Sequence, residues 1–172
     1  PPIPAPLYPA VDPDGTIRPE KTHADLKAFI ERLRVNAFPI RRPPFRDPIG
    51  ADREKAIRYF RSTMAYLREN GWARGAYWYA LDEPNDAEAY EKVRQLGRLA
   101  HDADPDLPVL ITEQTRSSND AWGTPEGAVD IWVPLWPLHD PPTAARALER
   151  GEELWSYTAL CTGPDGTPWW PL

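Results

Sequence analysis

Two patterns of apolar residues alternate along this chain. In the first, apolar residues recur every three or four positions, which is the period of an amphipathic helix. This pattern covers residues 23–34, 52–70, 86–103 and 140–149. In the second, apolar residues follow one another in short, nearly unbroken runs, at residues 35–40, 76–81, 109–112, 129–134 and 154–160. The alternation predicts five strands connected mainly by helices.

The unbroken character of the apolar runs indicates the kind of sheet. Strands with one wet face alternate apolar and polar residues, whereas parallel strands covered on both faces are apolar almost throughout. The chain is therefore predicted to be an α/β protein with about five parallel strands and crossover helices. A closed (β/α) barrel needs more strands than this. The residues alone leave open a partial TIM-type barrel and a smaller doubly wound sheet.

Prolines mark the candidate boundaries. The chain has 22 of them, gathered in residues 1–13, 39–48 and 134–142. We expect residues 1–22 to form a proline-rich lead-in and residues 23–172 to form one domain. Because the chain begins at Pro1 and its only methionine is Met64, we also expect it to be a piece of a longer protein.

Charge and composition exclude several classes of function. The net charge of −6 and the pI near 5.1 argue against nucleic acid or an anionic membrane as the main partner. No apolar stretch approaches the length of a membrane-spanning helix, so membrane insertion is not expected. The single cysteine, Cys161, excludes an intrachain disulfide, and the three histidines lack metal-ligand spacing. No glycine-rich phosphate loop follows a strand, so nucleotide binding has no support. Neither a cofactor nor a metal is expected.

The candidate chemistry begins with Asp82-Glu83-Pro84, which follows the apolar run 76–81. The C-terminal end of a parallel strand is where (β/α) folds build their active sites. Neighbouring carboxylates oppose each other's ionisation, which suits a site where one acid stays protonated and its neighbour is ionised. A carboxylate at this place can also cap the next helix. Because Asn85 and Glu88 already supply a capping-box-like start, the pair is not needed as a cap and is a candidate catalytic pair.

Aromatic residues are frequent in the loops that follow the predicted strands. The chain has eight tryptophans, of which Trp122 and Trp136 lie in such loops. Flat aromatic faces suit the C–H faces of sugar rings, although most tryptophans in proteins belong to the core. We expect three loops, 41–47, 116–122 and 136–139, to converge on the acidic pair, bringing Arg41 and Glu113 near it.

Three segments resemble the catalytic domain of glycoside hydrolase family 123. They are residues 70–84, which end in Asp82-Glu83-Pro84, residues 129–134 and residues 154–158. The resemblance covers about residues 52–160 and implies a (β/α) barrel that removes β-linked N-acetylgalactosamine. It also implies a carbohydrate substrate, no cofactor, and a secreted or periplasmic location. The first two strands of the family's usual order have no counterpart here.

The resemblance also assigns roles to residues. The family's nucleophile is the substrate's own 2-acetamido oxygen, outside the two-carboxylate scheme of most glycosidases. Glu83 would protonate the glycosidic oxygen and later deprotonate water, and Asp82 would orient and stabilise the acetamide. Tyr157 would donate a hydrogen bond to the acetamide oxygen or pack within the barrel. Trp155 and Trp132 would shape the wall of the pocket or the packing at the strand ends.

Two other functions stay open. In a retaining glycosidase with its own carboxylate nucleophile, Glu83 would again be the acid, and Glu113 is the only nearby second carboxylate. Alternatively, the chain would be a non-catalytic or degenerate domain that binds carbohydrate through its aromatic loops.

Overall fold

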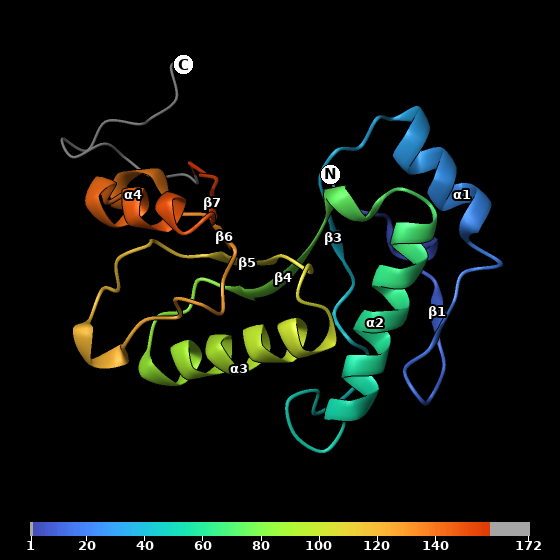
Figure 1. Cartoon of the computed structure of the whole chain (residues 1–172), viewed down its shortest axis with the longest axis horizontal. Coiled ribbons are helices and arrows are strands. Elements are labelled where there is room, and N and C mark those ends of the chain that lie inside the picture. The colour runs from blue at the N-terminus through green and yellow to red at the C-terminus, as the bar shows by residue number, and fades with distance from the viewer. Residues whose placement is uncertain (1, 159–172) are drawn as a thin grey trace. The chain divides into compact units, whose positions relative to one another are not determined.

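A computed structural model describes residues 2–158 of the chain. Five strands form one parallel sheet, in the order in which they occur in the sequence (Figure 1). They are β3 (Phe38–Ile40), β4 (Ala76–Asp82), β5 (Val109–Thr112), β6 (Ile131–Trp132) and β7 (Glu153–Leu154). The predicted α/β class and the predicted number of parallel strands are confirmed.

Helices make most of the connections between these strands. They are α2 (Arg53–Glu69), α3 (Ala87–Ala103) and α4 (Pro141–Glu149). Between β5 and β6 the chain is instead a loop with one short 3-10 helix, η4 (Asp120–Trp122). The strand order follows the chain without the reversal that defines a doubly wound sheet. The doubly wound alternative is therefore disfavoured among the described strands.

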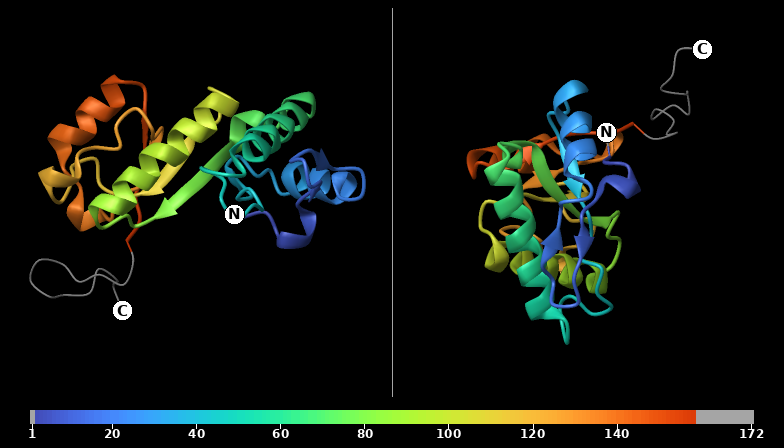
Figure 2. Two further views of the ribbon diagram at one scale, coloured as in Figure 1. Left: turned by 90° about the horizontal axis from the view of Figure 1, so that it is seen from below. Right: turned by 90° about the vertical axis from the view of Figure 1, so that its right-hand side faces the viewer.

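The chain divides into two compact units, and the first contains residues 1–80 and 95–109. Besides β3 and α2 it holds η1 (Ala5–Leu7), the antiparallel pair β1 (Ala10–Val11) and β2 (Ile17–Arg18), α1 (His23–Lys27), its π-helical continuation η2 (Ala28–Arg32), and η3 (Ala73–Gly75). These elements run from blue to green in Figure 2. The proline-rich lead-in therefore includes a hairpin, formed by β1 and β2. It also contributes to a core, because Ile3 and Ile17 are buried.

The core of the first unit is aromatic. Phe60 from α2 and Trp78 from β4 are almost fully buried, and their ring centroids lie 4.7 Å apart. At one end of α2, Arg68 donates two hydrogen bonds of 2.6 Å to the carboxylate of Asp104. These bonds lower the pKa of Asp104, which lies just after α3 and is 6% exposed. A buried carboxylate with a bidentate guanidinium partner is ionised and fixed in place.

The second unit contains residues 81–94 and 110–172, described to residue 158. Tyr90 and Val93 from α3 are buried, as are Ile111 from β5 and Trp132 from β6. Helix α4 contacts β7. Backbone hydrogen bonds continue the parallel pairing beyond β6 and β7 as far as a bridge between Leu135 and Tyr157. The predicted strands 129–134 and 154–160 are thus shorter as regular strands, and residues 159–160 lie outside the described part.

Helix ends in this unit follow local rules. Asp140 caps α4 by accepting the Thr143 N–H at 3.1 Å, and Asp86 accepts the Ala89 N–H at 2.7 Å at the start of α3. The cap of α3 is therefore Asp86 and not Asn85. This cap is supplied without Asp82 or Glu83.

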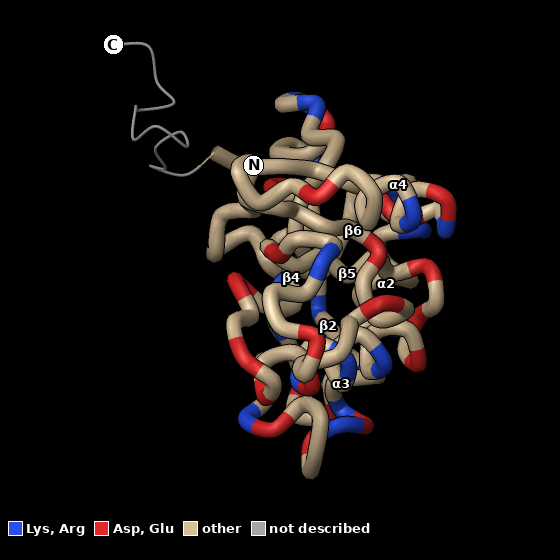
Figure 3. The backbone as a smooth tube through the Cα atoms, turned by 90° about the vertical axis from the view of Figure 1, so that its left-hand side faces the viewer, with Lys and Arg blue, Asp and Glu red and all other residues tan. Residues whose placement is uncertain are grey.

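Charge is spread along the described backbone. Figure 3 shows acidic and basic residues interspersed along the tube. None of the helices in the described part is long and apolar enough to cross a membrane.

Candidate active site

Asp82 and Glu83 stand where β4 ends, and both are tied to one side chain of the neighbouring strand. Thr112, the last residue of β5, donates its hydroxyl hydrogen to Asp82 Oδ1 at 2.7 Å. The same hydroxyl oxygen accepts the backbone N–H of Glu83 at 2.9 Å. One threonine therefore fixes the carboxylate of the first acid and the backbone of the second.

The backbone of Glu83 adopts a left-handed conformation, with φ of 41°. Residues other than glycine rarely adopt positive φ, because the side chain then crowds its own carbonyl. Such a conformation costs on the order of 1–3 kcal/mol and persists only where surrounding contacts enforce it. It ends the strand at Asp82 and breaks the alternation of side chains between the two faces. The two neighbouring carboxyl groups therefore need not point to opposite sides of the sheet.

Tyr157 holds the side chain of Glu83. Its hydroxyl donates a hydrogen bond of 2.5 Å to Glu83 Oε1. Tyr157 is positioned by its backbone, because its N–H donates to the Pro134 carbonyl at 3.3 Å and its carbonyl accepts from Trp136 at 2.9 Å. The phenol is thus bound to the carboxyl group that the resemblance identifies as the acid.

Glu113 is the third carboxyl group of the site and directly follows Thr112. It is only 8% exposed. Burial raises the pKa of Glu113 to about 7, and the nearby Glu83 carboxylate adds to the increase. Beside it, the buried Tyr90 hydroxyl makes no hydrogen bond of good geometry in the described part, yet lies near enough to Glu113 and Ser117 for each to influence its pKa. Burial raises the pKa of Tyr90 to about 12.

Glu83 and Glu113 line a cavity of about 250 Å³. Its wall includes Glu83 and Pro84 after β4, Glu113 after β5, and Tyr157. Trp122 also lines the cavity, and its ring meets the Tyr90 ring edge-on with the centroids 5.4 Å apart. The loops that contain Trp122 and Leu138 therefore share this cavity with Glu83, and the convergence of all three predicted loops on the acidic pair stays a prediction.

The other predicted site residues lie in four different settings. Trp132 is 1% exposed and donates its indole N–H to Glu152, so it packs within the unit. Trp155 is half-buried and donates its indole N–H to Glu153 at 3.0 Å. Trp136 is 48% exposed and stacks on His139, and neither ring lines this cavity. Arg41 belongs to the first unit and lines a cavity there with Tyr8; its role at the acidic pair stays a prediction.

Sequence reasoning missed Thr112 and Tyr90. Thr112 could have been predicted from its place in the sequence, because it ends the strand next to β4 and the C-terminal ends of adjacent parallel strands lie at the same edge of the sheet. Tyr90 has the spacing of an ordinary core residue of α3, and nothing in the sequence distinguishes its hydroxyl. Across residues 2–158 no group of three or more histidine, cysteine, aspartate or glutamate side chains is arranged so that it could hold a metal ion.

The raised pKa of Glu113 predicts an unusual pH dependence of stability. A folded-state pKa near 7, above the ordinary 4.5, means that the folded protein holds this proton more tightly than the unfolded chain. The resulting stabilisation is complete below about pH 4.5 and is lost as the pH rises through 7. Glu113→Gln should therefore gain up to about 3 kcal/mol in unfolding free energy relative to wild type between pH 5 and pH 8. Urea unfolding at several pH values measures this difference.

Glu149→Gln is the matched control for that measurement, because Glu149 is an exposed glutamate at the end of α4. It should follow the wild-type pH dependence. A constant difference in stability between Glu113→Gln and wild type across this pH range would show that the Glu113 carboxyl keeps its ordinary pKa.

No protein-family model matches this chain, and no curated protein matches its sequence.

Proposed function

We propose that this chain is a glycoside hydrolase that releases a β-linked N-acetylhexosamine, with N-acetylgalactosamine favoured, by substrate-assisted catalysis. One observation carries the proposal. Two adjacent carboxyl groups at a strand end are held by different side chains, Asp82 by Thr112 and Glu83 by Tyr157. The backbone of Glu83 itself is left-handed. Backbone strain of this kind gathers at functional sites, where contacts are arranged to maintain it. The resemblance of three sequence segments to family 123 supports the same conclusion.

In the first half of the proposed reaction, the acetamide oxygen of the substrate attacks C1 and the glycosidic C–O bond breaks. Glu83 gives its proton to the departing oxygen, which leaves as a hydroxyl group. The acetamide nitrogen gains positive charge as the oxazoline-like ring closes. Asp82, held by Thr112, accepts a hydrogen bond from that N–H and stabilises the charge.

In the second half, water adds to C1 and the ring opens to regenerate the acetamide. Glu83 accepts the proton of the attacking water and returns to its starting state. Tyr157 donates to Glu83 in the structure. We propose that this phenol shifts to the acetamide oxygen when Glu83 is protonated and substrate is bound, because a protonated carboxyl group is the weaker acceptor.

The fold supports this proposal through strand order. Parallel strands that follow the sequence without reversal are the arrangement of a singly wound (β/α) barrel, whose active sites lie at the C-terminal strand ends. Asp82, Thr112 and Glu113 lie at such ends. We therefore propose that the sheet is part of a TIM-type barrel.

A two-carboxylate retaining mechanism is the second candidate, because Glu113 faces the same cavity as Glu83. Its nucleophile would have to be ionised. The pKa of Glu113, raised to about 7 by burial, keeps a large part of this group protonated at neutral pH. That protonation suits a hydrogen-bond donor better than a nucleophile and favours the substrate-assisted mechanism.

The two mechanisms differ in their need for the acetamide. The protein should hydrolyse an aryl β-N-acetylgalactosaminide, and the matching aryl β-galactoside should show no turnover, because it lacks the internal nucleophile. Release of the aryl alcohol, followed by absorbance for both substrates at equal concentration, measures this. Equal hydrolysis of the two would support Glu113 as the nucleophile. Binding of both sugars without hydrolysis would support a carbohydrate-binding domain.

A further inference from the structure

A second cavity, of about 290 Å³, lies within the first unit. Three segments form its walls: Tyr8 lies just before β1, Glu20 and Lys21 follow β2, and Arg41 follows β3. One water molecule occupies about 30 Å³ in the liquid, so the cavity has more room than a phosphate ion needs. The proposed reaction assigns it no role.

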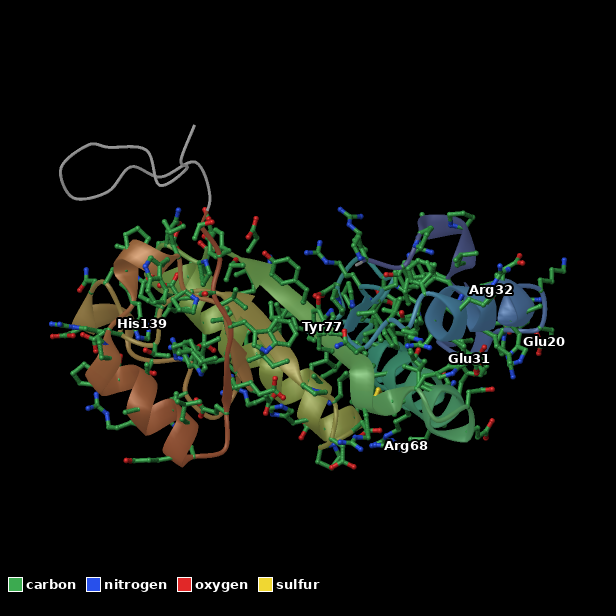
Figure 4. All side chains as sticks on the ribbon, turned by 90° about the horizontal axis from the view of Figure 1, so that it is seen from above. Glu20, Glu31, Arg32, Arg68, Tyr77 and His139 are labelled. Carbon is green, nitrogen blue, oxygen red and sulfur yellow. The ribbon has the colours of Figure 1, made fainter. Side chains whose placement is uncertain are left out.

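The wall of the second cavity is rich in cations. Arg18, Lys21 and Arg41 line it, and Glu20, labelled in Figure 4, is the only carboxylate among the described residues of the wall. Asp12 pairs with Arg18 at 2.9 Å and offsets its charge. Between residues 2 and 158, no carboxylate forms an ion pair with Lys21 or Arg41. Two such cations make the cavity locally positive in a chain whose net charge is −6, and this charge attracts an anion.

The position of Arg41 is fixed through its backbone. Tyr59, which is 3% exposed, donates its hydroxyl hydrogen to the Arg41 carbonyl at 2.8 Å. The Tyr8 hydroxyl donates to the Pro39 carbonyl at 3.1 Å, which joins the opposite wall to β3. Burial raises the pKa of Tyr8, and the nearby Arg41 guanidinium opposes part of this increase. The cation and the phenol ring therefore lie close together on a backbone that is already ordered, so a ligand does not have to order it.

Lys21 lies in a tight turn. The Pro19 carbonyl accepts the N–H groups of Thr22 and His23 at 2.9 and 2.8 Å, and the Thr22 hydroxyl at 3.3 Å. The hydroxyl hydrogens of Thr22 and Tyr8 are thus already donated to the backbone. The donors left for a ligand belong mainly to the cations. A guanidinium fork and an ammonium group are the side-chain donors that bind phosphate oxygens, and they need no glycine-rich loop.

We propose that the second cavity binds a phosphate monoester, with the phosphate between Lys21 and Arg41 and the organic part against Tyr8 and Pro9. A monoester carries nearly two negative charges at neutral pH, which match the two cations. Its organic part uses the ring surfaces of the tyrosine and the proline, and the volume that a free ion would leave empty. This role of Arg41 does not involve the acidic pair. The proposed hydrolysis neither consumes nor releases this ligand, so either proposal can fail without the other.

Calorimetry with phenyl phosphate at constant ionic strength tests the site. Arg41→Ala and Lys21→Ala should each raise the Kd about tenfold or more, the effect of a lost hydrogen bond to a charged group. Arg32→Ala is the matched control, because Arg32 is an exposed arginine of η2 that does not line the cavity. It should keep the wild-type Kd. Equal Kd values in Arg41→Ala and Arg32→Ala would overturn the proposal.

Glu20→Gln separates loss of charge from damage to the fold. Removing this exposed carboxylate from the wall should lower the Kd about twofold, and a misfolded variant would not bind more tightly. An unchanged or higher Kd in Glu20→Gln would contradict an electrostatic site.

Two other probes identify the kind of anion. Phenyl phosphate should bind more tightly than inorganic phosphate, which has no ring, and more tightly than phenyl sulfate, which carries a single charge. Equal binding of inorganic phosphate would show a site for the free ion and overturn the monoester. Binding of none of the three probes would remove the site.

Discussion

Glu83→Gln should lower kcat/KM for a natural β-N-acetylgalactosaminide by about 10²–10⁴-fold, the usual contribution of a positioned general acid. A glutamine has nearly the shape of glutamate and still accepts the Tyr157 hydrogen bond, but it cannot protonate the departing oxygen. A nitrophenolate needs little protonation as it leaves. The loss should therefore shrink steadily as the leaving group becomes more acidic, and a plot of log kcat/KM against leaving-group pKa should be steeper for the variant than for the wild type.

Glu88→Gln provides the control for this series. Glu88 lies in the first turn of α3, is exposed, and lines neither described cavity. The same chemical change there should leave the plot at its wild-type slope. A Glu83→Gln loss that is equal for every leaving group would show that Glu83 does not act as the acid, and Glu113, which burial keeps partly protonated near pH 7, would take its place.

Local signals in the sequence were sufficient for most of the secondary structure. The unbroken apolar run 109–112 is strand β5 with the same bounds, and Asp140-Pro141 opens α4 as the capping rules predict. The place of the acidic pair at a strand end could also be predicted from the sequence, because it depends only on where the apolar run 76–81 stops. Helices and buried strands differ in the spacing of their apolar residues, and this difference can be recognised in a single sequence.

What the sequence could not predict depends on contacts between distant residues. The left-handed backbone of Glu83 is imposed by Thr112 and Tyr157, and glutamate has no intrinsic preference for it. The hairpin of β1 and β2 lies among prolines that indicated an irregular segment. As regular strands β6 and β7 end at Trp132 and Leu154, and beyond them only a few backbone hydrogen bonds and the bridge between Leu135 and Tyr157 continue the pairing. In each case tertiary contacts override a local preference.

Asp82→Asn should lower kcat by about 10²–10³-fold for every leaving group, the size of the loss when one group that stabilises transition-state charge is removed. The amide oxygen of asparagine can still accept the hydrogen bond that Thr112 donates to Asp82. The backbone bond between Glu83 and Thr112 is likewise retained. The variant therefore keeps the position of the side chain and loses only its negative charge. That charge is needed while the acetamide ring closes, a step that every leaving group shares.

Two further measurements separate loss of charge from loss of position. Thr112→Val removes the hydroxyl that holds Asp82 and the Glu83 backbone, whereas Thr112→Ser keeps a hydroxyl and should retain most activity.

A thiazoline that mimics the cyclised acetamide should bind wild type tightly, because it resembles the strained intermediate. Asp82→Asn should weaken that inhibitor by a factor close to its loss in kcat. Full activity in Asp82→Asn, with unchanged inhibition, would show that the acetamide is not the nucleophile. The only other carboxyl group that lines the described cavity with Glu83 is Glu113, and Glu113→Gln should then be inactive.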